Sequence, residues 1–132
     1  MKVPGGTAGL ARLGQLAALK RDAELARLAG VAQSRQRLLL ALSALKEAEH
    51  PLASEPGTAL DTALIAAQLA HRRWIEAQQR RLNQQLALVT ADWLRQKPAA
   101  ARAFGRAAVL EDLTEQAHRD ARRDVQRKRD SA

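Results

Sequence analysis

Apolar residues recur along two segments of the chain with the spacing of helices that pack along a single stripe. Within residues 8–49 the alternating steps of three and four positions run from Leu28 to Leu45 and, after a slip in phase near residues 20–24, continue earlier at residues 10–17. Within residues 59–129 they run from Ile75 to Trp93. We call this stripe the seam. Its apolar members are Leu38, Leu42 and Leu45 in the first segment and Ile75, Leu82, Leu86, Val89 and Trp93 in the second. Arg35 and Gln79 are polar residues at seam positions.

A loop is expected between these two segments, at residues 50–58. Pro51, Pro56 and Gly57 lie close together there, and proline cannot continue a helix. A loop of this length lets the two seams face each other. The sequence therefore predicts an all-α fold, in which two long helices form an antiparallel coiled-coil hairpin within a single domain, residues 1–132.

The start of each helix has its own signals. Residues 1–7 contain the glycine-rich stretch VPGGTAG and are expected to be a flexible lead-in to the first helix. Thr58 or Ser54 is predicted to cap the second helix, with Asp61 favourably placed near its positive end.

The second helix is predicted to be longer than the first and to be bent or interrupted near Pro98. That proline either kinks one long helix or occupies the first turn of a new one, where its missing N–H costs little. Beyond it, the segment LEDLTEQAHRDARRDVQRKRD has strong helix formers and ends in a basic run. Fraying of the helix is expected after about Arg122.

Composition supports helices and excludes several classes of protein. Alanine and leucine supply most of the apolar residues, and only 2% of the residues are aromatic. The absence of cysteine excludes disulfides, thiolate catalysis and cysteine-based zinc sites. The longest apolar run, LLLAL, is far shorter than the roughly 20 residues that span a bilayer. With no recognisable signal peptide, the chain is expected to be soluble and cytoplasmic.

Few residues suggest chemistry. The three histidines, His50, His71 and His118, lack the spacing of metal ligands, and no glycine-rich phosphate loop is present. The carboxylates read as helix-surface residues, and a two-helix hairpin offers no cavity that excludes water. We therefore expect no catalytic residues, no cofactor, no metal and no small-molecule substrate, and predict that the protein is not an enzyme.

The net charge of +8 favours an acidic partner, although it is equally typical of solvated helix faces with surplus arginine. The segment RRWIEAQQRR places Arg73 and Arg80 a heptad apart beside an aromatic residue, which would suit phosphates and stacked bases. The positive charges are, however, spread around the helix among glutamine and glutamate. Binding of nucleic acid is therefore a less favoured alternative.

The two tryptophans receive different interpretations. Trp93 lies on the seam and is expected to pack against the first helix. Trp74 lies off the seam and is expected to face a partner, because exposed tryptophans are common in interaction hot spots. Just before it, Leu64, Ile65 and Leu69 form a second apolar patch, which either closes the hairpin end or docks a partner.

These features together resemble the FliJ family of stalk proteins in flagellar type III export and their injectisome relatives. The resemblance includes a WI-x-x-Q-like start at Trp74, the L-N-Q stretch, the motif TADWLRQK and the LE-x-L segment at Leu110. It covers most of residues 10–129 and is clearest from Trp74 to Leu113. Pro98 and the proline-rich loop depart from the straight hairpin of that family.

The resemblance implies a function and several partners. Family members insert into the hexameric export ATPase, promote its assembly, couple it to the export-gate membrane protein and escort export chaperones. It implies a cytoplasmic location, peripheral to the membrane-embedded apparatus. The residues expected at the export gate are Leu64, Ile65, Leu69 and Trp74. The residues expected at the ATPase ring are Arg119, Arg122, Arg123, Arg127 and Lys128. A generic coiled-coil scaffold is the other alternative.

Overall fold

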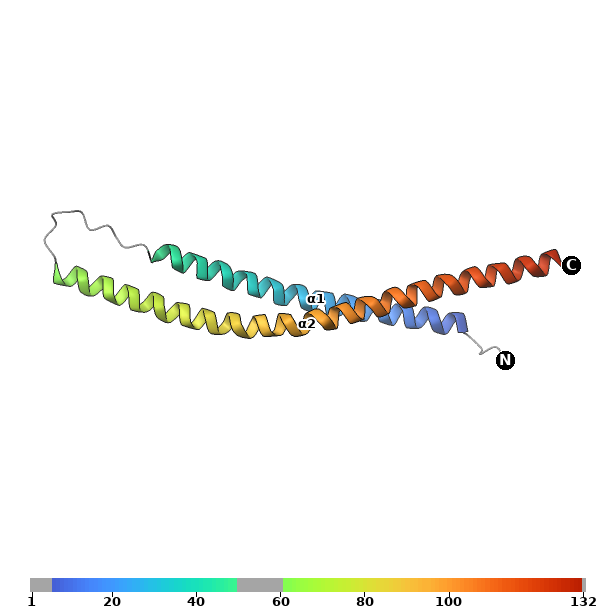
Figure 1. Cartoon of the computed structure of the whole chain (residues 1–132), viewed down its shortest axis with the longest axis horizontal. Coiled ribbons are helices and arrows are strands. Elements are labelled where there is room, and N and C mark those ends of the chain that lie inside the picture. Colours follow the sequence, from blue (N-terminus) through green and yellow to red (C-terminus); the bar gives the residue numbers. More distant parts are fainter. Residues whose placement is uncertain (1–5, 50–60, 132) are drawn as a thin grey trace. The chain divides into compact units, whose positions relative to one another are not determined.

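The computed structural model describes residues 6–49 and 61–131, which form an all-α helical hairpin (Figure 1). Helix α1 spans Gly6–Ala48 and helix α2 spans Thr62–Asp130. No strand is present among the described residues. The predicted fold class is confirmed, and the predicted limits of the two helices differ from the observed ones by at most three residues. Neither described helix has a stretch long and apolar enough to cross a lipid bilayer.

The N-terminus of α2 is capped by Asp61. The backbone N–H of Ala63 donates a hydrogen bond to Asp61 Oδ1 at 3.0 Å, and Ile65 N–H donates to the Asp61 carbonyl at 3.1 Å. This is the usual arrangement of an N-cap residue, whose side chain satisfies a free donor of the first turn. The predicted caps, Thr58 and Ser54, lie outside the described residues.

Helix α2 continues through Pro98 without a break, so of the two predicted alternatives the start of a new helix is wrong, and a bend at Pro98 stays a prediction. Proline removes one backbone donor and leaves the carbonyl of Leu94 without its usual intrahelical partner. Pro98 is exposed and Leu94 is 58% exposed, so water can reach this turn. The residues that follow, Ala99 to Ala101, favour a helix strongly enough to continue it.

The last turns of α2 are helical up to Asp130, one residue beyond the predicted end. The helix reaches Asp130 and Ser131 N–H donates to the Arg127 carbonyl at 3.0 Å, so the expected fraying after Arg122 is wrong. Pairs four residues apart support these last turns, including the hydrogen bond from Gln126 Nε2 to Asp130 Oδ1 at 3.2 Å.

The chain divides into two packing units. Unit 1 contains residues 1–29 and 94–132, and unit 2 contains residues 30–93. Within each unit, one part of α1 packs against one part of α2, and the two parts run antiparallel. The two units differ in the size of the side chains that fill them.

Unit 2 has a seam of large aliphatic side chains. Ile75 is 1% exposed and is the largest fully buried residue among those described. The other apolar seam positions of this unit are half-buried: Leu38, Leu42, Leu45, Leu82, Leu86, Val89 and Trp93. Burial of such side chains is the main favourable contribution to pairing the helices here.

Unit 1 is packed by small side chains. Its buried apolar residues, among those described, are Ala100, Ala103 and Ala107, each at most 5% exposed. A Cβ added at Gly14 on α1 would lie 3.8 Å from Thr114 Oγ1 on α2. Alanine and glycine let the helices approach, but they bury little apolar area, so this unit gains less from packing than unit 2.

Candidate interaction surfaces

Arg35, the polar residue at the α1 seam of unit 2, contacts two residues of α2. Its guanidinium carbon lies 5.1 Å from the centroid of the Trp93 ring, which is a cation–π geometry. Its Nε also donates a hydrogen bond to Thr90 Oγ1 at 3.4 Å. Trp93 therefore packs at the seam against Arg35, a charged residue at a position where the seam pattern predicts an apolar side chain.

Gln79, the polar residue at the α2 seam, likewise has a partner on the other arm of the hairpin. Its side-chain Nε2 donates a hydrogen bond to Glu49 Oε1 at 2.9 Å, beyond the last residue of α1. Both polar seam residues of unit 2 thus have partners across the helix pair, and neither interrupts the pairing.

Glu24 of unit 1 is a buried carboxylate that sequence reasoning missed. It is only 6% exposed, and Lys20 Nζ lies 2.9 Å from its Oε1. The hydrogen bond from Lys20 lowers the Glu24 pKa below its ordinary value, while burial acts in the opposite direction and charge from Lys20 and Arg27 adds to the lowering. Its Oε2 is buried without a hydrogen-bond partner among the described residues.

The four residues expected at an export gate are all exposed on the first turns of α2, between 40% and 55%. Ile65 and Leu69, one turn apart, lie on the same side of the helix. Trp74 lies nine residues beyond Ile65 and, at about 100° per residue, projects from the opposite side. Its ring stacks on His71 with centroids 6.4 Å apart. The four residues therefore do not share one face. Ile65 and Leu69 lie together on one side and Trp74 on the opposite side, while Leu64 lies between them, about 80° from Trp74 and about 100° from Ile65.

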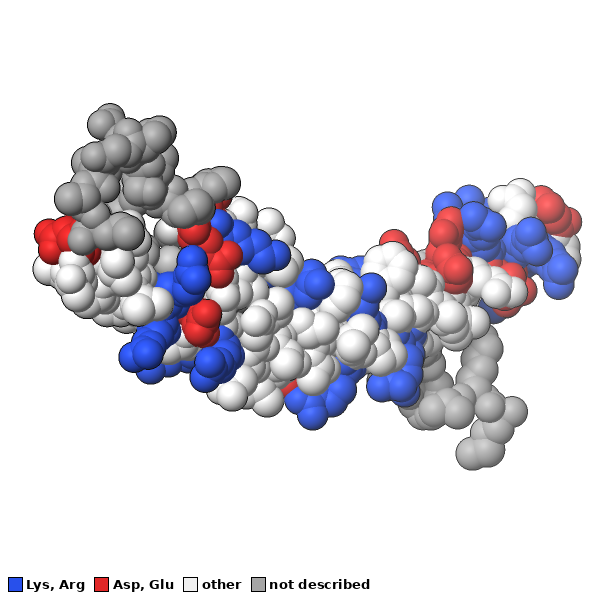
Figure 2. All heavy atoms as spheres, turned by 60° about the vertical axis from the view of Figure 1, so that its left-hand side comes forward, with Lys and Arg blue, Asp and Glu red and all other residues white. Residues whose placement is uncertain are grey.

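The five basic residues expected at an ATPase ring are all exposed in the last turns of α2. They alternate with Asp120, Asp124 and Asp130, and Arg119 forms an ion pair with Glu115 one turn earlier. Figure 2 shows this interleaving of basic and acidic side chains over the visible surface. Because Arg122 and its neighbours are solvated, their charge is available to an acidic partner.

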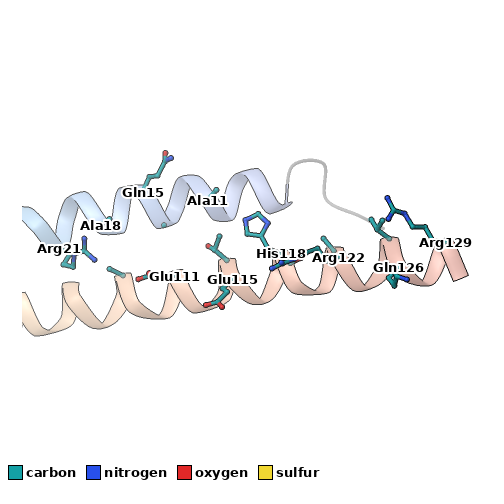
Figure 3. Close-up of a pocket in the computed structure, with 15 residues that line it drawn as sticks. Ala11, Gln15, Ala18, Arg21, Glu111, Glu115, His118, Arg122, Gln126 and Arg129 are labelled. Carbon is teal, nitrogen blue, oxygen red and sulfur yellow. The ribbon is translucent and has the colours of Figure 1, made fainter.

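A groove in unit 1 is a second surface that sequence reasoning missed (Figure 3). It has a volume of about 1180 Å³ and lies between the start of α1 and the last third of α2. Its floor consists of small side chains: Ala11, Gly14, Ala18, Ala107 and Ala121. The signal that could have revealed it is this run of alanine and glycine at inward positions, which cannot fill the space between two helices.

Polar side chains of α2 line one edge of the groove, and we call them the polar stripe. They are Glu111, Glu115, His118, Arg122, Gln126 and Arg129. Their spacing of three or four residues places them on one side of the helix. The His118 ring projects from α2 toward α1 (Figure 3).

The described residues contain no group of three or more His, Cys, Asp or Glu side chains that could hold a metal ion. His71 and His118 lie far apart along α2, and His50 lies outside the described residues. Comparison with models of known protein families, with curated proteins and with solved structures finds no match to this chain.

Proposed function

We propose that this chain is a stalk or adaptor of a flagellar-type protein export apparatus, as its resemblance to the FliJ family implies. In this role it promotes assembly of the hexameric export ATPase in the cytoplasm and couples it to the export-gate membrane protein. It has no catalytic role of its own, and export chaperones are further partners. The observation that carries the proposal is that one long helix, α2, exposes an apolar surface in its first turns and a basic surface in its last turns.

The apolar surface supports contact with the gate protein. Leu64, Ile65 and Leu69 are each at least 40% exposed. Ile65 and Leu69 lie side by side on one face and Leu64 lies about 100° around the helix from Ile65, and exposing such aliphatic side chains to water is unfavourable. Burying them against a partner recovers about 25 cal/mol for each Å² of apolar area removed from water. Trp74, on the other side of the helix, is left free for a different contact.

The basic surface supports contact with the ATPase. Arg119, Arg122, Arg123, Arg127 and Lys128 project into solvent from one continuous helix. A rigid helix with regularly spaced cations suits a pore or cleft with an acidic lining, because complementary potentials guide association and orientation. Such contacts are weakened by salt, since the charges are exposed.

The test measures the hydrolysis rate and the hexamer fraction of the export ATPase from the same organism, with and without the full chain. We expect the parent chain to raise both quantities. Replacing Arg119, Arg122 and Arg123 by glutamine should reduce the stimulation several-fold, because these side chains are exposed and their loss leaves the hairpin folded. Truncation after Leu113 should abolish it.

The matched control removes the same number of charges from the first half of α2. Arg73, Arg80 and Arg81 are also exposed, so their replacement by glutamine should leave the stimulation close to the parent value. Equal losses in both triple variants would show that only net charge matters. If the parent chain has no effect on the ATPase at micromolar concentration, the proposal fails, and a scaffold or nucleic-acid partner takes its place.

A further inference from the structure

The groove of unit 1 is open along the last third of α2. Val125 lines the groove and is still 52% exposed, although it follows Ala121 on the side of α2 that faces α1. The small floor residues leave room above them, so a third helix can come close to both α1 and α2. An apolar floor with one exposed aliphatic residue and a polar edge is the usual form of a groove that accepts an amphipathic helix.

The polar stripe along this groove divides by charge. Its acidic residues, Glu111 and Glu115, come first, and its basic residues, Arg122 and Arg129, come last. His118 lies between the two pairs. An occupant that complements this edge must therefore carry its positive charge beside Glu111 and its negative charge beside Arg129.

An identical helix laid antiparallel meets that requirement. When His118 lies opposite Arg122 of the other copy, Glu111 lies opposite Arg129 of the other copy. A two-fold axis between the two helices relates the copies, so each of these two pairs occurs twice. Glu115 then lies beside Val125 and Gln126 of the other copy. Such self-complementary pairing is what a symmetric two-fold interface requires.

We propose that this groove takes α2 of a second copy of this chain, packed antiparallel, so that two hairpins form a symmetric dimer. Each α2 fills the groove of the other copy and covers the exposed Val125. The alanine and glycine floor allows the helix axes to approach closely. The charge order of the stripe sets the register and opposes parallel packing, in which like charges would face each other. The inference does not rest on the proposed export function, although Arg122 belongs to both surfaces.

The experiment measures the molar mass of the full chain by light scattering and sedimentation equilibrium. Concentrations should run from about 1 to about 100 µM, because association depends on protomer concentration. One variant carries Glu111→Arg with Glu115→Arg, and a second carries Arg122→Glu with Arg129→Glu. Each variant alone should raise the dimer dissociation constant at least about tenfold, since residues 111 and 129 then carry like charges opposite each other at both ends of the interface.

The decisive measurement mixes the two variants in equal amounts. In the mixture, opposite charges face each other again, so dimers should return as heterodimers of one variant with the other. Circular dichroism at each step confirms that the helices remain folded. A purely structural effect of the substitutions would not be reversed by mixing.

Matched controls make the same charge changes outside the groove. Asp112→Arg with Asp120→Arg corresponds to the first variant, and Arg123→Glu with Arg127→Glu corresponds to the second. All four residues are exposed and none lines the groove. Both controls should dimerise like the parent chain. The proposal is overturned if the parent chain is monomeric at every concentration, if controls and groove variants behave alike, or if the mixture stays monomeric.

Discussion

Three polar side chains at inward-facing positions have three different environments. Arg35 has both an aromatic ring and a hydroxyl on the opposite helix, and Gln79 has a carboxylate. Glu24 has its nearest cation, Lys20, on its own helix, and its second oxygen is unpaired among the described residues. A buried charge that lacks a cross-helix partner stabilises pairing less than its contacts suggest, because it must still be desolvated.

Glu24 should make the stability of the hairpin depend on pH in the acidic range. Its pKa in the folded chain is lowered from the ordinary value of 4.5, mainly by the hydrogen bond from Lys20. A lowered folded pKa contributes stability that is fully present above the unfolded value and is lost as the pH falls through the folded value. Glu24→Gln should therefore flatten the loss of stability below about pH 4.5, measured by urea unfolding from about pH 3 to 6.

A second substitution separates this effect from the general acid sensitivity of the chain. Lys20→Met removes the hydrogen bond and raises the Glu24 pKa, so the acid-induced loss should begin at higher pH than in the parent chain. If the parent and Glu24→Gln chains have the same dependence on pH, Glu24 is not responsible for it.

At the scale of the helix, Pro98 shows that local helix propensity outweighs a single breaker. The proline costs one hydrogen bond, but strong helix formers surround it and its turn is open to water. The helix is therefore continuous but locally weakened. Gly105 also weakens the helix. A Cβ added there meets no atom within 4 Å, so packing does not require a glycine at this position, and its cost is the backbone entropy that glycine loses on folding.

Pro98→Ala should stabilise the hairpin by about 1 to 3 kcal/mol, since it restores a backbone donor and removes the steric clash in the helix interior. The measurement is the free energy of unfolding in urea, followed by circular dichroism. Gly105→Ala is the matched control and should gain only about 0.5 to 1 kcal/mol. A loss of stability in Pro98→Ala would mean that the proline relieves strain in this turn.

At the scale of the whole molecule, two helices support two units with different packing. Unit 2 buries Ile75 and half-buries a row of leucines, while unit 1 buries alanines and a carboxylate. Because apolar burial scales with side-chain area, unit 2 holds its helices together more strongly. Unit 1 also contains the open groove. Packing of another chain there would bury more apolar area than the small alanine side chains of unit 1 bury by themselves.

Hydrogen exchange should reveal this difference within α1 alone. Backbone amides of residues 12–28, in unit 1, should exchange about tenfold or more faster than those of residues 32–45, in unit 2, because local opening is easier where less apolar area is buried. Mass spectrometry at low protein concentration measures both segments in one sample. Equal protection of the two segments would contradict the comparison of packing.

Much of the fold could be predicted from the sequence because helix formation is a local property. The three–four spacing of leucines, the abundance of alanine and the prolines between residues 50–58 are enough to predict two helices and a hairpin. The errors occurred where competing local effects had to be weighed, in the alternative of an interrupted helix at Pro98 and in the fraying expected after Arg122. In both places, continued helix hydrogen bonding outweighed the expected break.

Only the tertiary structure decided how the two helices meet. The pairing of Arg35 with Trp93, the burial of Glu24 and the groove beside Ala121 depend on which distant residues become neighbours. Hydrophobic periodicity shows which side of a helix faces inward, but it does not set the register between helices or the size of the space left between them. Those depend on the volumes of side chains contributed by both helices at each level, and that information exists only once the chain has folded back on itself.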